Sequence, residues 1–335
     1  MIEILLFFIG ASLLLYVIFG GADYGAGILE LLPIKKKMRA EQTHVINEAM
    51  GPVWEANHMW LILVIVILFM GFPLIFTTLM TALHIPMVAL LVGIVIRGSV
   101  FTFRHYDPLS EEKSQNVYTK LFGISSLWTS LWLGIIVASL NRGYINPTAL
   151  DFHTAYIRPW FGLYPLMTGI FVVFIFAFLS AIYLIGETNH IELKKVFARR
   201  AYALNILVIV TGGLVFLTSE LESGTLLNDF MQHPAAIFCL LSATFLFVLL
   251  WFFIEKRKTY HARIVAAGQA TLILAGWYLL YAPNAMTTSN GPVSFFTAAA
   301  PPATLLQLVL ALLVGSLFIF PSLFFLIKVF KINKP

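Results

Sequence analysis

The sequence has little of two things on which most soluble enzymes depend, charge and cysteine. Only 11% of its 335 residues are Asp, Glu, Lys or Arg, whereas soluble domains carry about 25%. The one cysteine, Cys239, lies in an apolar run, so no disulfide or metal framework can form within the chain. The low charge excludes a soluble globular enzyme.

Long apolar runs stand where the charge is missing. Hydrophobic residues make up 60% of the chain, and the mean hydropathy is +0.90. A helix needs about 20 apolar residues to cross a bilayer, and runs of this length lie at 4–32, 52–76, 79–103, 119–141, 159–186, 201–219, 235–254, 263–282 and 302–327. We therefore predict an all-α polytopic membrane protein of about nine transmembrane helices. Residues 1–335 would form a single integral-membrane domain, with no soluble domain.

The basic residues outside these runs fall almost entirely on alternate connections. One set of connections carries only Arg142 and Arg158. The other set carries 18 basic residues: Lys35, Lys36, Lys37, Arg39, Arg104, Lys113, Lys120, Lys194, Lys195, Arg199, Arg200, Lys256, Arg257, Lys258, Arg263, Lys328, Lys331 and Lys334. Cytoplasmic loops are enriched in Lys and Arg, so the N-terminus is expected outside and the C-terminus in the cytoplasm.

Three ionisable residues fall inside the first three apolar runs, and this orientation places them in one leaflet. At 1.5 Å per residue, Asp23 lies roughly 13 Å from the cytoplasmic end of its helix. Glu55 lies about 5–9 Å in from the same side, and Arg97 roughly 9 Å. Ionisable groups at this depth cost about 3 kcal/mol each on insertion scales and by default mark proton paths, ion paths or cofactor sites.

Each of these residues also has a purely structural interpretation. Glu55 could stabilise the start of its helix, where a carboxylate interacts well with the helix dipole. Asp23 and Arg97 could be a buried ion pair that joins two helices. His58 follows Glu55 by three residues on the same helix face, with Asn57 beside it. It could belong to a proton relay, be a hydrogen-bonded core histidine, or ligate a haem.

No cofactor or metal site stands out in this chain. The sequence has no His-x-x-His or Cys-x-x-Cys-His spacing and no dinucleotide or phosphate loop. From the residues alone, the chain is a helix bundle with a protonatable entry that leads from the cytoplasm into the membrane, and nothing in it says what consumes the proton.

Two N-terminal motifs resemble subunit II of the cytochrome bd-type quinol oxidases. The first follows the family pattern Gly-x-Asp-x-Gly-x-Gly in residues 21–27. The second follows Pro-x-Trp-(Asp/Glu)-x-Asn-x-x-Trp-Leu in residues 52–61. The segment from Arg97 to Asp107 resembles the family's arginine-rich segment more loosely, and the length, nine spans and orientation agree over the whole chain.

The resemblance implies a role in reducing O₂ to water with electrons from membrane quinol, in the bacterial inner membrane. It places haem b and haem d in a separate subunit I, against which this chain packs, and no catalytic residue in this chain. It implies a cytoplasmic proton path through Asp23 and Glu55, which match the family's acidic positions; some members have Asp in place of Glu55. Asn57 and His58 would hydrogen-bond the path, and Arg97 would tune its acidity.

Several points stay open at this stage. Some members of the family hold a structural quinone in this subunit, and a small single-helix subunit is a further candidate partner. Nothing in the sequence suggests binding to nucleic acid. The rival functions are a proton-coupled transporter, which would show inverted repeats and broken helices at the membrane midplane, and a purely structural scaffold for subunit I.

Overall fold

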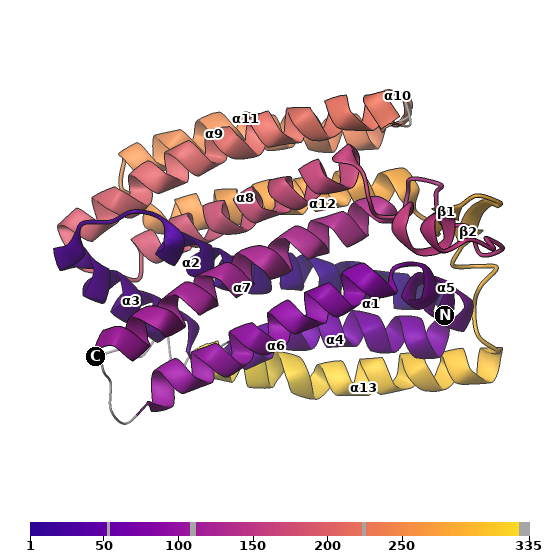
Figure 1. The fold of residues 1–335 in the computed structure, drawn as a ribbon, viewed down its shortest axis with the longest axis horizontal. Coiled ribbons are helices and arrows are strands. Elements are labelled where there is room, and N and C mark those ends of the chain that lie inside the picture. The colour runs from indigo at the N-terminus through magenta and orange to yellow at the C-terminus, as the bar shows by residue number, and fades with distance from the viewer. Residues whose placement is uncertain (52–53, 108–111, 223–225, 328–335) are drawn as a thin grey trace.

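The fold is a bundle of long helices, given by a computed structural model that describes residues 1–51, 54–107, 112–222 and 226–327. Within these residues, nine helices are long and apolar enough to cross a membrane, and they lie side by side in Figure 1. This confirms the predicted all-α polytopic class. The spans are Ile2–Leu31, Trp54–Gly71, His84–Arg104, Lys113–Ser139, Leu163–Ile185, Ile191–Glu222, Pro234–Glu255, Thr259–Tyr281 and Pro302–Ser322.

The first span is built from three segments, the last of which is buried inside the bundle. They are α1 (Ile2–Leu15), a π-helical turn η1 (Tyr16–Gly20) and α2 (Gly21–Leu31). Residues 21–30 are all buried, because α2 packs against α7 (Glu112–Ser139) on one side and α8 (Leu163–Ile185) on the other. Glycine makes this closeness feasible: a Cβ on Gly25 would lie 1.9 Å from the carbonyl oxygen of Phe176 in α8.

The predicted second and third spans are wrong in their boundaries. Residues 52–76 are not one helix, because α4 (Trp54–Gly71) ends before Phe72 and a short helix α5 (Pro73–Ala82) follows. The third span, α6 (His84–Tyr106), begins at His84, not at residue 79. Pro73 explains the break, since proline disfavours a helical conformation in the residue before it.

The remaining long helices are α9 (Ile191–Glu222), α11 (Pro234–Glu255), α12 (Thr259–Tyr281) and α13 (Pro302–Ile327). We had expected Lys194, Lys195, Arg199 and Arg200 to lie in a loop before residue 201, but they occupy the first turns of α9. At 32 residues α9 is about 48 Å long, which exceeds the roughly 30 Å of hydrocarbon in a bilayer. Its basic first turns can therefore extend beyond the apolar layer.

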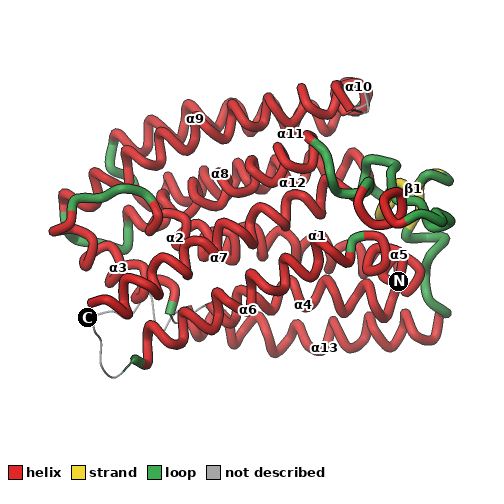
Figure 2. Tube along the Cα trace, in the orientation of Figure 1, coloured by secondary structure: helices red, strands yellow, loops and turns green. Residues whose placement is uncertain are grey.

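One end of the bundle carries an unpredicted amphipathic helix, α3 (Lys36–Met50), and we call it the basic end. Here α3 lies beside the connections 186–190 and 256–258 (Figures 1 and 2). Lys35, Lys36, Lys37 and Arg39 are exposed there. The grouping agrees with the charge pattern on which the orientation was predicted; that orientation itself stays a prediction, and Lys328, Lys331 and Lys334 lie outside the described residues.

The opposite end carries a β-hairpin within the uncharged 283–301 connection, and we call it the hairpin end. Strands β1 (Asn284–Thr288) and β2 (Gly291–Ser294) are antiparallel, with Met286 opposite Val293. Arg142 closes this end: its Nη2 lies 2.6 Å from Glu222 Oε2 in α9, and its Nη1 donates to the carbonyl of Pro159 at 3.2 Å. Further short helical segments here are η2 (His153–Ile157) and α10 (Leu226–Gln232).

Candidate functional site

The most deeply buried charges of the chain are a single ion pair between α2 and α6. Arg97 Nη2 lies 2.6 Å from Asp23 Oδ1, and the two side chains are 1% and 0% exposed. The second carboxylate oxygen, Oδ2, is also buried and accepts no hydrogen bond from the described residues. Asp23 therefore has one oxygen held by a cation and one that is able to take a proton.

Side chains from α7 and α2 support the long arginine as it crosses from α6. Its Nε donates to Ser126 Oγ at 3.2 Å. Its guanidinium lies 4.7 Å from the ring centre of Tyr24 and 4.8 Å from that of Phe122, close enough for cation–π attraction. The guanidinium is thus fixed by ring faces and by polar groups.

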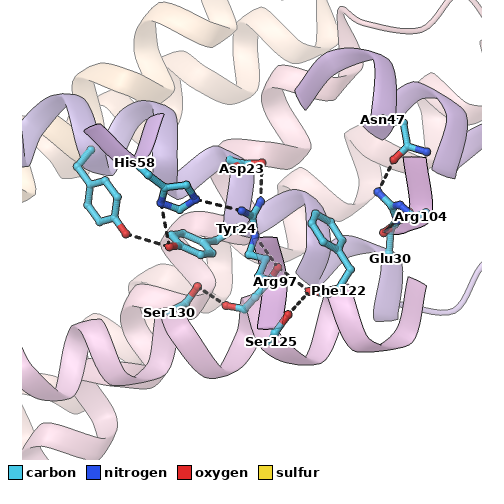
Figure 3. A network of polar contacts seen from close by, with 12 residues as sticks. Asp23, Tyr24, Glu30, Asn47, His58, Arg97, Arg104, Phe122, Ser125 and Ser130 are labelled. Carbon is cyan, nitrogen blue, oxygen red and sulfur yellow. Dashed lines mark hydrogen bonds and ion pairs between the residues drawn. The ribbon is translucent and has the colours of Figure 1, made fainter. Parts of the chain in front are cut away.

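The third polar partner of Arg97 is His58, which comes from α4. Arg97 Nη1 lies 3.2 Å from His58 Nε2. The other ring nitrogen, Nδ1, is 3.4 Å from the Tyr24 hydroxyl, which is 3.0 Å from the Tyr16 hydroxyl in η1. Figure 3 shows the series Asp23, Arg97, His58 and Tyr24 as one connected set of contacts. It links the first three spans at one depth.

A second ion pair repeats this arrangement nearer the basic end (Figure 3). Arg104 Nη1 donates to Glu30 Oε2 at 2.7 Å, and both side chains are 1% exposed. Arg104 Nη2 also donates to the Asn47 side chain of α3. The ring of Phe122 lies 4.5 Å from this guanidinium as well, so one phenylalanine contacts both arginines.

Beyond the second pair, polar side chains cap the end of α2. Arg200 of α9 donates to the carbonyls of Leu29, Leu32 and Pro33 at 3.0–3.3 Å. Gln42 of α3 donates to the Leu29 carbonyl at 3.2 Å and accepts from Arg200 at 3.0 Å. The last carbonyls of a helix have no partner within it, and here cations and amides satisfy them.

The structure brings together three of the five residues predicted for the proton path. Asp23, Arg97 and His58 are in contact, as described above. Asn57 is buried in α4 but makes no side-chain hydrogen bond with the described members of the site. Glu55 is exposed on α4, and within the described part of the chain its carboxylate has no hydrogen bond or ion pair with this site. Asp23 is therefore buried in an ion pair, whereas Glu55 is exposed at the surface of the chain.

Several members of the site were not predicted from the sequence, among them Tyr16, Tyr24, Glu30, Asn47 and Arg104. Glu30 and Arg104 fell at the predicted ends of spans, where charged residues are ordinary. A signal for them existed, because Glu30 follows Asp23 by seven residues and Arg104 follows Arg97 by seven. Because this spacing is equal on the two helices, contact between Asp23 and Arg97 also brings Glu30 within reach of Arg104.

Metal binding finds no support in this arrangement. Within the described ranges, no three His, Cys, Asp or Glu side chains lie close enough together to hold a metal ion. The chemistry available is that of a buried carboxylate that can hold or release a proton under the influence of a fixed cation.

Comparison with known proteins links this site to a family. A family model for cytochrome bd terminal oxidase subunit II matches residues 1–330. A chain in the structure of bd oxidase from Geobacillus thermodenitrificans has a similar fold, with a TM-score of 0.76 and 20% identity over 97% of this chain and 98% of that one.

A curated relative matches over a shorter length. Cytochrome bd ubiquinol oxidase subunit 2 of Bacillus subtilis (strain 168) is 26% identical over 152 residues, 45% of this chain and 43% of the relative. The matched part thus spans less than half of that protein. Because the family model covers nearly every residue, the chain belongs to the cytochrome bd terminal oxidase subunit II family.

Proposed function

We propose that this chain is the non-haem subunit of a bd-type quinol oxidase, which reduces O₂ to water, and that it supplies part of a cytoplasmic proton path. The observation that carries the proposal is the Asp23–Arg97 site, where Oδ1 of a fully buried carboxylate is in the ion pair and Oδ2 accepts no hydrogen bond from the described residues. Such a group can load and release a proton, and consumption of protons is inherent in the reduction of O₂ to water. The chain is a multi-pass protein of the bacterial inner membrane.

The exposure of Glu55 argues that a partner subunit covers the outer face of α4. It shares this face with Met59, Ile62 and Val66, which are 44%, 58% and 41% exposed and follow it at the spacing of one helix face. A carboxylate facing lipid at membrane depth costs several kcal/mol, so we infer that a second chain covers it. The partner proposed here is the haem-bearing subunit I.

In this proposal, residues of this chain bind and transfer protons, and the redox groups belong to subunit I. Haem b and haem d would lie in subunit I, and quinol would be the substrate of the whole complex. Glu55 would pass protons at the interface, and Asp23 would hold one inside the chain. Asn57 and His58 follow Glu55 by two and three residues in α4 and would hydrogen-bond the path. A structural quinone and a small single-helix subunit are further proposals that the described contacts neither need nor oppose.

The test compares Glu55→Gln and Asp23→Asn in the assembled complex, with Glu192→Gln as the control. Glu192 is an exposed acid of α9 whose ion pair among the described residues is with Lys195. We expect quinol-driven O₂ uptake per haem to fall by about 100-fold or more in both path variants, the usual range for losing a proton-transfer group, and to stay unchanged in the control. Wild-type uptake in both path variants, with haem content unchanged, would refute the proton path.

A scaffold function without proton transfer is the second candidate, and the two ion pairs favour it. Each pair joins α2 to α6 across α7, as a structural cross-link would. A scaffold predicts that Asp23→Ala lowers the yield of complex whereas Glu55→Gln leaves turnover intact. The proton-coupled transporter is not favoured, since Asp23 lies eight residues before the end of the first span at Leu31 and the chain belongs to an oxidase family.

A further inference from the structure

The contact between Arg97 and His58 fixes the protonation state of the imidazole. A guanidinium has only N–H donors and no acceptor. Across the 3.2 Å contact, His58 Nε2 must therefore accept from Arg97 Nη1. A neutral imidazole has one N–H, so the proton is on Nδ1 and His58 is uncharged in this arrangement.

That assignment gives a direction to the hydrogen bonds behind His58. Nδ1–H donates to the Tyr24 hydroxyl at 3.4 Å, which leaves the Tyr24 proton for a hydrogen bond to the Tyr16 hydroxyl at 3.0 Å. Tyr24 also has its ring against the Arg97 guanidinium and parallel to the ring of Phe176 in α8. Tyr16 lies in the π-helical turn of the first span, a local geometry often found at functional sites.

A proton cannot pass from Asp23 to His58 through these contacts. A relaying imidazole takes a proton on one nitrogen and gives up the other. Here Nε2 is occupied by an N–H of Arg97, and an arginine is not deprotonated in proteins. Among the described residues, His58 is connected to Asp23 through this permanent cation.

We propose that His58, Tyr24 and Tyr16 form a positioning arm that holds the Arg97 guanidinium on Asp23, and that His58 works as a neutral bridge, not as a proton carrier. The arm needs an acceptor facing Arg97 and a donor facing Tyr24. This inference rests on the proposed function of Asp23 in proton transfer, and it assigns Tyr24 and Tyr16 as positioning residues of that site.

The decisive comparison is between His58→Gln and His58→Leu in the complete oxidase complex. A glutamine carboxamide offers one acceptor and one donor at the end of a side chain of similar reach, yet it does not titrate. We expect His58→Leu to lower quinol-driven O₂ uptake per haem by about tenfold, as fits the loss of one charge-assisted hydrogen bond. His58→Gln should restore uptake to within about twofold of the wild type, because both bonds are retained.

The tyrosines provide a second and milder test. Tyr24→Phe keeps the ring against Arg97 but removes the acceptor for His58, so we expect a fall of about threefold, close to the loss of one neutral hydrogen bond. Tyr16→Phe should have a smaller effect, since Tyr16 contacts Arg97 only through the other two members. Tyr278→Phe is the matched control: this tyrosine donates to the Leu6 carbonyl at 3.4 Å, away from the arm.

The outcomes separate this inference from the proposed function. Equal impairment of His58→Gln and His58→Leu would overturn the arm, because the imidazole itself would then be required. Wild-type uptake in His58→Leu would overturn it too. The His58→Leu complex could fail to assemble, and two other results would then overturn the positioning arm. One is an inactive His58→Gln variant, and the other is a Tyr24→Phe variant with the same uptake as Tyr278→Phe. A wild-type rate of O₂ uptake in the Asp23→Asn variant would instead show that the proposed function of Asp23 in proton transfer is wrong.

Discussion

The two buried ion pairs of this chain use the same chemistry at two depths. Asp23–Arg97 and Glu30–Arg104 both join α2 to α6, and both arginines contact the ring of Phe122. The first lies about 10 Å deeper, seven residues along each helix. In the deeper pair, Arg97 also contacts His58, which is followed by two tyrosines. In the other pair, Arg104 also contacts Asn47 of the surface helix α3.

The comparison shows how surroundings decide what an ion pair can do. Around Glu30 and Arg104, the residues Asn47, Gln42 and Arg200 provide a dense polar layer close to the end of the bundle. Around Asp23 and Arg97, the ring faces of Tyr24 and Phe122 lie against the guanidinium, and its other polar neighbours are Ser126 and His58. A change of protonation at Asp23 therefore has few ways to be compensated, which suits a group whose charge state controls transfer. The pair nearer the end is better suited to fixing helix positions.

The largest effect is expected from removing the deep cation. Arg97→Met leaves the Asp23 carboxylate buried without its partner, which typically costs about 3–5 kcal/mol. The yield of haem-containing complex from solubilised membranes should collapse. The double variant Asp23→Leu with Arg97→Met should recover much of the yield, since replacing both partners of a buried pair is often neutral. Equal yields from the single and double variants would contradict this account.

The next effect is expected from separating α2, which carries both acids, from α8. In Gly25→Ala the new methyl group would lie 1.9 Å from the Phe176 carbonyl and 2.7 Å from Ser180 Cβ, and overpacking of this kind costs about 1–3 kcal/mol or more. Thermal stability of the purified complex should fall. Gly10→Ala is the matched control, because its Cβ would meet only Tyr278 at 3.9 Å. Similar melting temperatures for the two variants would show that α2 does not need this close contact.

A moderate effect is expected when charge is removed from the pair nearer the basic end. Glu30→Gln keeps an oxygen that can accept from Arg104 but loses the ionic component, at a cost of about 1–2 kcal/mol. Melting should shift slightly, and O₂ uptake should stay near the wild-type rate, in contrast with Asp23→Asn. If Glu30→Gln stopped uptake as completely as Asp23→Asn, the two pairs would not differ in function.

The smallest effect concerns the cap that holds the end of α2 beneath these pairs. Arg200→Lys keeps the charge but loses the planar fork that reaches the carbonyls of Leu29, Leu32 and Pro33. We expect a loss of about 1 kcal/mol in stability. Arg199→Lys, an exposed neighbour on the same helix, should be neutral. Equal melting curves for the two variants would show that the cap does not contribute to the stability of the bundle.

The sequence was informative wherever hydropathy and charge act alone. Nine apolar runs predicted nine spans, and the depth estimate placed Asp23 and Arg97 at one level, where the structure pairs them. The same reasoning grouped Glu55 with them, but depth contains no information about which face of a helix a residue occupies. Glu55 is on the exposed face of α4, and His58, three residues later, is turned toward Arg97.

Other features could have been read from local signals and were not. Met38, Gln42, Val45 and Ala49 are spaced as one buried face of a helix, which is what α3 is. Pro73 signalled the break in the second span, and Asn290-Gly291 signalled the hairpin turn. By contrast, the contact of Asn47 with Arg104 depends on how α3 folds back on the bundle, and no local pattern specifies that.

The spacing of the two ion pairs also governs when they can form during synthesis. Each acid precedes its arginine by 74 residues. At roughly 5–20 residues per second, the ribosome needs about 4–15 s to cover that distance. In a chain inserted as it is made, the first helix would enter the bilayer with Asp23 and Glu30 before either arginine exists. The two ion pairs at the centre of this bundle can therefore form only when the third span arrives.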